Sequence, residues 1–204
     1  MCTRPSTELF GVALAGFCAL AGCGAAPKTA DPAAPVSKAK VTSVERFMPL
    51  VAGTVYSFET TVENSNDKGV MMVAVDRPRD GMATLTVGGK VERLELVPEG
   101  IRLATGGWLL KSPLERGTRY RGGFGEVVVE AIDREVEVPA GRYRGCVVII
   151  EESVTGRKKV TTTFCPDVGM VLMEAEGMIG NDYGHERAAL KSYGKRVDIN
   201  DMGK

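Results

Sequence analysis

The amino-acid sequence predicts an all-β protein: a single antiparallel meander that forms a strongly curved sheet or a barrel of about 10 to 11 strands. The chain has 25 glycines in 204 residues, and apolar stripes of helical period are scarce. Clusters of turn-forming residues separate its short apolar runs. Curvature or closure is expected because it removes exposed strand edges.

The composition is that of a globular protein, with 44% hydrophobic and 25% charged residues. The 26 basic side chains balance 26 acidic ones, so the formal net charge is zero. This balance removes the electrostatic reason to expect nucleic acid as a partner. The length is sufficient for one compact domain after the N-terminal segments.

Residues 1–22 have the pattern of a secretory signal peptide: Arg4 precedes an apolar run from Leu9 to Gly22 that is too short to span a bilayer. The four residues before and including Cys23 read LAGC and resemble the lipobox of bacterial lipoproteins. That resemblance implies cleavage before Cys23, attachment of diacylglycerol to its thiol and acylation of the new amino group, as with palmitate. An ordinary cleaved signal and a buried N-terminal helix are the alternatives.

A lipid on Cys23 would anchor the chain to a membrane, because each buried methylene contributes about 0.8 kcal/mol. Gly24 follows the cysteine, where resemblance to enteric sorting associates aspartate with retention in the inner membrane. We therefore expect a protein of the bacterial cell envelope, on the periplasmic side of the outer membrane rather than on the inner membrane.

Three further segments are expected after the signal peptide. Residues 23–40 combine three prolines with alanine and lysine, and predict a lipid-attached flexible tether. Residues 41–195 form the β domain, and residues 196–204 a flexible tail.

Within the domain, turn signals delimit the strands. Gly88-Gly89 predicts a two-residue hairpin turn, and the clusters at 64–69 and 76–81 predict further turns. Helix-forming residues give 185–193 a helical alternative. The expected strands are 54–63, 68–76, 81–87, 90–97, 100–110, 118–132, 134–138, 142–152, 158–165, 168–176 and 185–193.

The stretch from Pro139 to Val171 predicts the central hairpin. If Thr155 and Gly156 form its turn, facing residues have numbers that add up to 311. Cys146 then faces Cys165, and Glu152 faces Lys159 as an opposite-charge pair. Because both faces of the first strand carry apolar residues, we expect it to be covered on both sides.

Facing cysteines lie within disulfide reach, and thiols tend to oxidise outside the cytoplasm. Cys146 and Cys165 are therefore the predicted disulfide. Two buried free cysteines and a redox-active pair are the alternatives.

One segment of the domain is repeated. Residues 49–56 (PLVAGTVY) and 113–120 (PLERGTRY) share five identities in eight at an offset of 64. Proline and glycine at this spacing predict a turn that starts a strand, used twice. Chance and a true duplication are the alternatives.

These motifs resemble a group of exported bacterial β proteins and lipoproteins. The segments that carry the resemblance are PLERGTRY, VPAGRYRGCVVI at 138–149 and TTTFCPDVGMVLME at 161–174. It extends over residues 47–176 and implies a β fold and an envelope location. It implies no activity.

The sequence contains no recognisable catalytic constellation. His185 is the single histidine, and no GxSxG motif is present, so we predict no enzyme, no cofactor and no metal site. The acidic residues near 64–69 and 176–186 favour turns over a calcium site. Methionines 71, 72, 82, 170, 173 and 178 suit either core filling or an adaptable apolar cavity.

We therefore predict a lipid-anchored envelope lipoprotein that is a non-enzymatic interaction or structural module, with an envelope protein as partner. The alternative is a carrier or chaperone that binds an apolar small molecule, such as a lipid or acyl chain, in a β-barrel cavity. A cavity lined by methionine and valine would favour the carrier. A filled core with an exposed apolar edge would favour the interaction module.

Overall fold

The computed structural model describes residues 43–63, 68–179 and 182–196. The predicted signal peptide, the whole predicted tether with Cys23, and all of the predicted tail except Arg196 lie outside these ranges. Residues 39–204 form a compact unit of their own, and every described strand lies within it.

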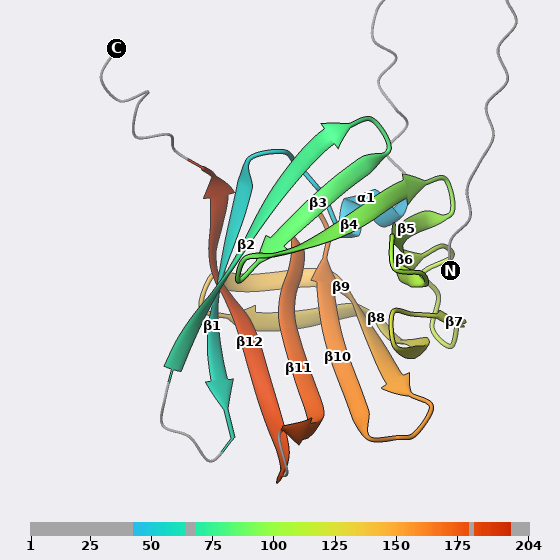
Figure 1. Ribbon diagram of the computed structural model, residues 1–204, viewed down its shortest axis with the longest axis vertical. Coiled ribbons are helices and arrows are strands. Elements are labelled where there is room, and N and C mark those ends of the chain that lie inside the picture. Colours follow the sequence, from blue (N-terminus) through green and yellow to red (C-terminus); the bar gives the residue numbers. More distant parts are fainter. Residues whose placement is uncertain (1–42, 64–67, 180–181, 197–204) are drawn as a thin grey trace, which may run out of the picture. The chain divides into compact units, whose positions relative to one another are not determined.

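Within the described residues, twelve strands form one antiparallel sheet, which confirms the predicted fold class (Figure 1). The sheet order is β6-β5-β4-β3-β2-β1-β12-β11-β10-β9-β8-β7. The strands are β1 (Thr54–Val62), β2 (Lys68–Arg79), β3 (Met82–Val87), β4 (Lys90–Val97), β5 (Gly100–Leu103), β6 (Trp108–Lys111), β7 (Arg119–Arg121), β8 (Gly125–Val138), β9 (Gly141–Ser153), β10 (Lys158–Cys165), β11 (Gly169–Ile179) and β12 (Asp182–Lys195).

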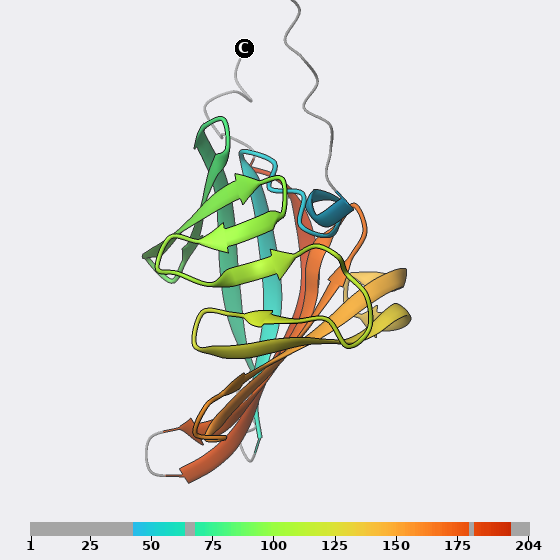
Figure 2. The ribbon, with the colours of Figure 1, turned by 90° about the vertical axis from the view of Figure 1, so that its right-hand side faces the viewer.

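The sheet is a meander in which β1 pairs with β12, so the first and last strands lie side by side in its middle. Its two edges are the consecutive strands β6 and β7. The sheet curves strongly, and Figure 2 shows β3–β6 folded over the strands that follow. The loops beside the two edges touch: a Cβ atom added to Gly107 would lie 1.9 Å from the carbonyl oxygen of Gly122.

Several predicted strand boundaries were wrong. The strand expected at 118–132 is divided into β7 and β8, and β2 continues to Arg79 through part of the turn expected at 76–81. The single strand expected at 100–110 is divided into β5 and β6, because Gly106 and Gly107 adopt positive φ angles of 103° and 85° in the turn between them. Conversely, the chain has no break near residue 133, where one predicted strand ends and the next begins. β8 continues through an irregularity in its pairing, at which Asp133 has a φ of 56°.

The helical alternative for 185–193 does not form. This segment belongs to β12, which pairs with β1 on one side and β11 on the other. Ala188, Ala189 and Leu190 are buried there. Hydrogen bonding to two neighbouring strands and this burial outweigh a helix propensity that amounts to a few tenths of a kcal/mol per residue.

A short helix, α1 (Ser43–Phe47), precedes the sheet and was not predicted. It lies against β5 and β11. Val44 is completely buried, and the backbone N–H of Met48 donates to the Val44 carbonyl oxygen at 3.2 Å. Five residues are too few for a periodic apolar stripe, so sequence periodicity could not detect the helix.

The central hairpin has the predicted register: Lys159 pairs with Glu152 and Phe164 with Val147. The turn is Val154–Arg157, four residues rather than two, but it has the same centre. The predicted charge pair is not the one formed. The ammonium group of Lys159 lies 3.7 Å from the carboxylate of Glu176 on β11, its partner in the other ladder.

The β8–β9 hairpin extends beyond the sheet and turns back across its outer side (Figure 1). The backbone N–H of Ala140, in the turn of this hairpin, donates to the Leu190 carbonyl oxygen on β12 at 2.9 Å. Cys146 and Val147 are neighbours in β9 that point to opposite faces, and both are buried. This end of β9 is therefore covered on both sides, as predicted.

Candidate ligand cavity

The concave face of the sheet lines a half-open cavity of about 340 Å³. Its walls come from seven strands and from the segment after α1, and nearly all of its surface is apolar. The lining residues are Met48, Tyr56, Phe58, Met71, Val73, Leu85, Val87, Leu109, Glu151, Val160, Thr162, Phe164, Met170 and Met173.

Strand alternation directs these side chains inward. Facing residues of an antiparallel pair point to the same side, and Phe58 faces Met71 across β1 and β2. Val73 in turn faces Val87 across β2 and β3. The same rule places Thr162 beside Met173 on the other wall.

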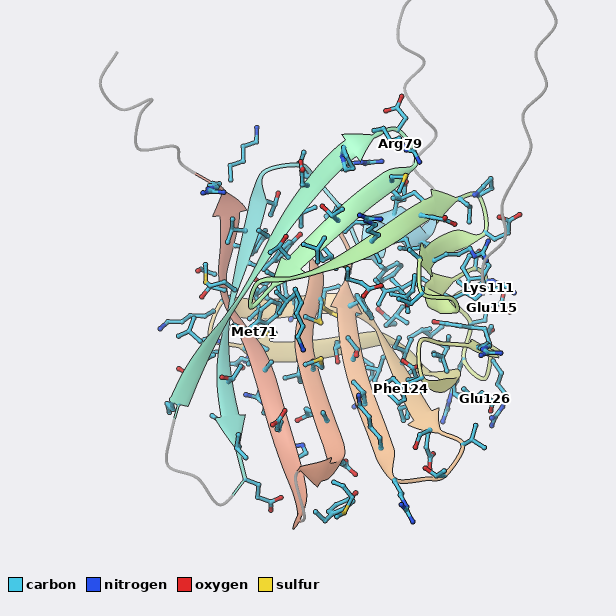
Figure 3. The ribbon with its side chains drawn as sticks, in the orientation of Figure 1. Met71, Arg79, Lys111, Glu115, Phe124 and Glu126 are labelled. Atoms are coloured by element: carbon cyan, nitrogen blue, oxygen red, sulfur yellow. A yellow bond between two sulfur atoms is a disulfide. The ribbon has the colours of Figure 1, made fainter. Side chains whose placement is uncertain are left out.

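Methionine is prominent in this wall. Met71, Met170 and Met173, from the group singled out in the sequence, line the cavity together with Met48. Met72, the neighbour of Met71, points to the opposite face and is 49% exposed (Figure 3 labels Met71). An unbranched, polarizable thioether adapts to ligands of different shape, so these residues suit an apolar guest.

The repeated segment forms the same turn twice, as predicted. The backbone N–H of Thr54 donates to Val51, and that of Thr118 donates to Glu115, at 3.1 and 3.0 Å. Gly53 and Gly117 adopt φ angles of 77° and 85°. Each turn thus starts a strand that carries a buried tyrosine.

Tyr56, the tyrosine of the first turn, has a satisfied hydroxyl group. It is 5% exposed and donates a hydrogen bond of 3.0 Å to the carbonyl oxygen of Val168. Burial, together with the nearby Tyr193, raises the pKa of Tyr56 to about 12.

Tyr120, the tyrosine of the second turn, has an unsatisfied hydroxyl group. Its side chain is 7% exposed, and its hydroxyl group has no hydrogen-bond partner among the described residues. The backbone of Lys111 lies close enough to lower the pKa of the hydroxyl group, as a hydrogen-bond donor does, and a donor provides no acceptor for the O–H. Burial raises the pKa of Tyr120, and the charge of Glu151 raises it further, whereas the Lys111 backbone lowers it.

Tyr120 and Glu151 lie in one row across the sheet. Tyr120 faces Val127, Val127 faces Glu151, and Glu151 faces Val160. Because Glu151 and Val160 line the cavity, the whole row is on the concave side.

The loop between β7 and β8 holds the Glu151 side chain. Its Oε1 atom accepts backbone N–H groups from Phe124 at 2.6 Å and from Gly125 at 2.9 Å (Phe124 is labelled in Figure 3). The loop closes tightly around the carboxylate: a Cβ atom on Gly122 would lie 2.4 Å from Oε1. The absence of a side chain at Gly122 therefore allows the loop backbone to reach an acidic side chain.

A second carboxylic acid lies on the same concave face. Glu92 on β4 faces Leu85, which lines the cavity. Its Oε1 atom is buried and has no hydrogen-bond partner among the described residues. Lys90 also lies on this face, opposite Val87, but the charged residue that lines the cavity itself is Glu151.

The two residues predicted from the hairpin do not contribute to this site. Cys146 and Cys165 form a disulfide with an S–S distance of 2.03 Å and a Cα–Cα distance of 4.2 Å. They occupy the face opposite to Phe164, and Cys146 is 0% exposed. The disulfide therefore links β9 to β10 behind the cavity wall.

Sequence reasoning assigned no ligand-binding residues and missed Glu151 and Tyr120. A signal for Glu151 was present, because the hairpin register places it on the same face as Val147 and Ile149. An acidic residue that continues an apolar face is a candidate site residue. No comparable signal existed for Tyr120, since its closeness to Glu151 depends on the pairing of β7, β8 and β9.

His185 lies on β12 opposite Glu176. Within the ranges that the structure describes, no group of three or more His, Cys, Asp and Glu residues could hold a metal ion. In the same ranges, no helix has the length and apolar character needed to cross a membrane.

Fold and cavity define a class: an antiparallel, nearly closed β sheet with an apolar site on its concave face. No protein-family model and no curated protein matches the chain. Among solved structures, it is similar to a Bacteroides fragilis protein described as exported and as having a YmcC-like fold. Their identity is 12% and their TM-score 0.43, over 71% of this chain and 97% of that one.

A second similar structure is a Parabacteroides distasonis protein described as a lipoprotein. The identity is 12% and the TM-score 0.36, and the match covers 72% of this chain and 98% of that one. Neither similarity assigns an activity.

Proposed function

We propose that this protein is a lipid-anchored envelope lipoprotein whose β domain binds a small apolar ligand, such as an acyl chain, on the concave face of its sheet. It acts as a carrier or chaperone for that ligand rather than as an enzyme. The cavity is the observation that carries the proposal.

The size and lining of the cavity support a binding role. Protein interiors are close-packed, and voids larger than a water molecule are few. A volume of about 340 Å³ falls at the lower end of the range of about 300–1,000 Å³ that is usual for ligand pockets. Its lining of methionine, valine and aromatic residues offers a guest apolar contact from several strands.

Envelope location and lipid attachment rest on the sequence. The LAGC segment ending at Cys23 supports the anchor, and Gly24 supports the periplasmic side of the outer membrane. A carrier held there by a tether would meet acyl chains at the membrane surface.

An interaction module is the second candidate, and the hairpin tips favour it. Val154 is 98% exposed in the β9–β10 turn, and Tyr183 is 66% exposed at the start of β12. Capture of an envelope protein that is lost when Val154 is changed to Ser would support this candidate. We prefer the carrier because the concave face lines a cavity, and an interaction module does not require one.

The cavity is tested by a substitution that fills it. Residues 39–204 are made without the N-terminal segments, and binding of Nile red, an uncharged dye, is measured by its fluorescence together with displacement by dodecanol. We expect Met71→Trp to weaken dye and dodecanol binding about tenfold, or about 1.4 kcal/mol, because the indole occupies the apolar space.

The matched control is Met72→Trp, which places the same indole on the exposed face of the same strand and leaves binding unchanged. Denaturant midpoints establish that both variants fold. Equal binding by folded Met71→Trp and wild type would refute the proposal, as would an absence of dye binding and of co-purified lipid in native mass spectrometry of the wild type.

A further inference from the structure

Building on the proposed function, we infer that the cavity selects apolar ligands that carry a hydroxyl head group and rejects those that carry an anionic one. Glu151 lines the cavity, and Tyr120, outside the lining itself, ends the same row of the concave face. Glu151 accepts the hydrogen bond of the ligand hydroxyl, and Tyr120 donates one to its oxygen.

Glu151 is the one charged residue among the described residues that line the cavity. Two backbone N–H groups donate to its Oε1 atom, so the protein fixes the position of this side chain at the cavity. Both of these hydrogen bonds go to the same oxygen. The second carboxylate oxygen is the acceptor for a ligand donor.

Tyr120 supplies the complementary group. Its buried O–H lacks an acceptor among the described residues, and an unsatisfied buried donor costs about 1–3 kcal/mol. The related turn at Tyr56 shows that the same local structure can satisfy its hydroxyl through Val168. The unsatisfied donor is therefore a property of the second turn, and a ligand oxygen would restore its hydrogen bond.

A hydroxyl head matches both groups because it donates one hydrogen bond and accepts others. An ionised carboxylate cannot donate to Glu151, and its charge would lie beside another negative charge in an apolar environment. A methyl ether accepts from Tyr120 but leaves Glu151 without a donor. The head-group preference is therefore alcohol, then ether, then carboxylate.

The experiment measures displacement of Nile red from residues 39–204 at neutral pH by dodecanol, by its methyl ether and by dodecanoate, which share one alkyl chain. We expect dodecanol to compete about tenfold better than the ether, and dodecanoate to compete worst. Glu151→Gln keeps an acceptor for the loop N–H groups but removes the charge, and should improve dodecanoate competition about tenfold or more.

Glu152→Gln is the matched control, since Glu152 is the exposed neighbour on the opposite face and its change should leave the order of the three ligands intact. Tyr120→Phe should weaken competition by dodecanol and by its methyl ether alike, by about tenfold, and leave the preference between them, because both ligand oxygens accept from Tyr120. Equal competition by the three ligands, with no effect of Glu151→Gln, would overturn the head-group inference and leave the cavity as a binding site. Failure of the dye and of every ligand to bind would overturn both proposals.

Discussion

At the scale of single residues, the two buried tyrosines separate a structural role from a ligand-binding one. They follow the same turn, yet Tyr56 is hydrogen-bonded within the protein and Tyr120 is not. Similar local sequence thus places two hydroxyl groups in different surroundings. The neighbouring strands, and not the turn, determine whether each hydroxyl is satisfied.

This difference predicts that removing the two hydroxyl groups has different effects on stability. Tyr56→Phe leaves the buried Val168 carbonyl oxygen without its donor and should lower the free energy of unfolding by about 1 kcal/mol. Tyr120→Phe removes a donor that has no acceptor and should be neutral or slightly stabilising. Urea denaturation of the ligand-free domain measures both, and a loss at Tyr120→Phe as large as that at Tyr56→Phe would contradict the assignment.

At the scale of elements, the β9–β10 hairpin shows how far local sequence determines structure. Its register followed from the position of one turn, and the structure pairs Lys159 with Glu152 accordingly. The predicted ion pair between Glu152 and Lys159 was wrong because each residue of an inner strand faces one residue on each of the two adjacent strands. Lys159 reaches Glu176 on the strand that sequence reasoning could not place beside it.

The disulfide of this hairpin should contribute to stability. Cys146 and Cys165 are 19 residues apart, and closing a loop of that length restricts the unfolded chain by about 3 kcal/mol. We expect Cys146→Ala/Cys165→Ala to lower the free energy of unfolding by about this amount. Mass spectrometry after alkylation is the control: two reactive thiols in the native, unreduced protein would show that the bond is absent.

At the scale of the whole molecule, the arrangement of the sheet creates the site. The pairing of β1 with β12 joins the two halves of the chain in one sheet, and the curvature of that sheet bends β3 and β4 over the later strands. Only then do Met71, Phe164 and Met173 face one common space. The cavity is therefore a product of long-range pairing and belongs to no single motif.

The membrane anchor is also a property of the whole chain, and it remains a prediction because Cys23 lies outside the described residues. Labelled palmitate should enter the full-length protein in bacteria, and a Cys23→Ser variant should lose the label and move from the membrane to the soluble fraction. The label would depend on the thiol because only a thiol forms the thioether. Equal labelling of wild type and variant would exclude the anchor.

The sequence by itself determined the antiparallel β fold, most strand positions and the register of the central hairpin. These follow from alternation and turn chemistry, which act between residues close in the chain. It also identified the repeated turn and several methionines of the cavity wall, but neither Glu151 nor Tyr120 as site residues.

Tertiary structure alone decided the pairing of β1 with β12, the strand conformation of 185–193, the cavity, and the approach of Tyr120 to Glu151. The physical reason is that each depends on which face of the sheet becomes concave. Curvature and closure set that face through contacts between residues far apart in the chain, and the local pattern of apolar and polar residues is the same whichever way the sheet bends.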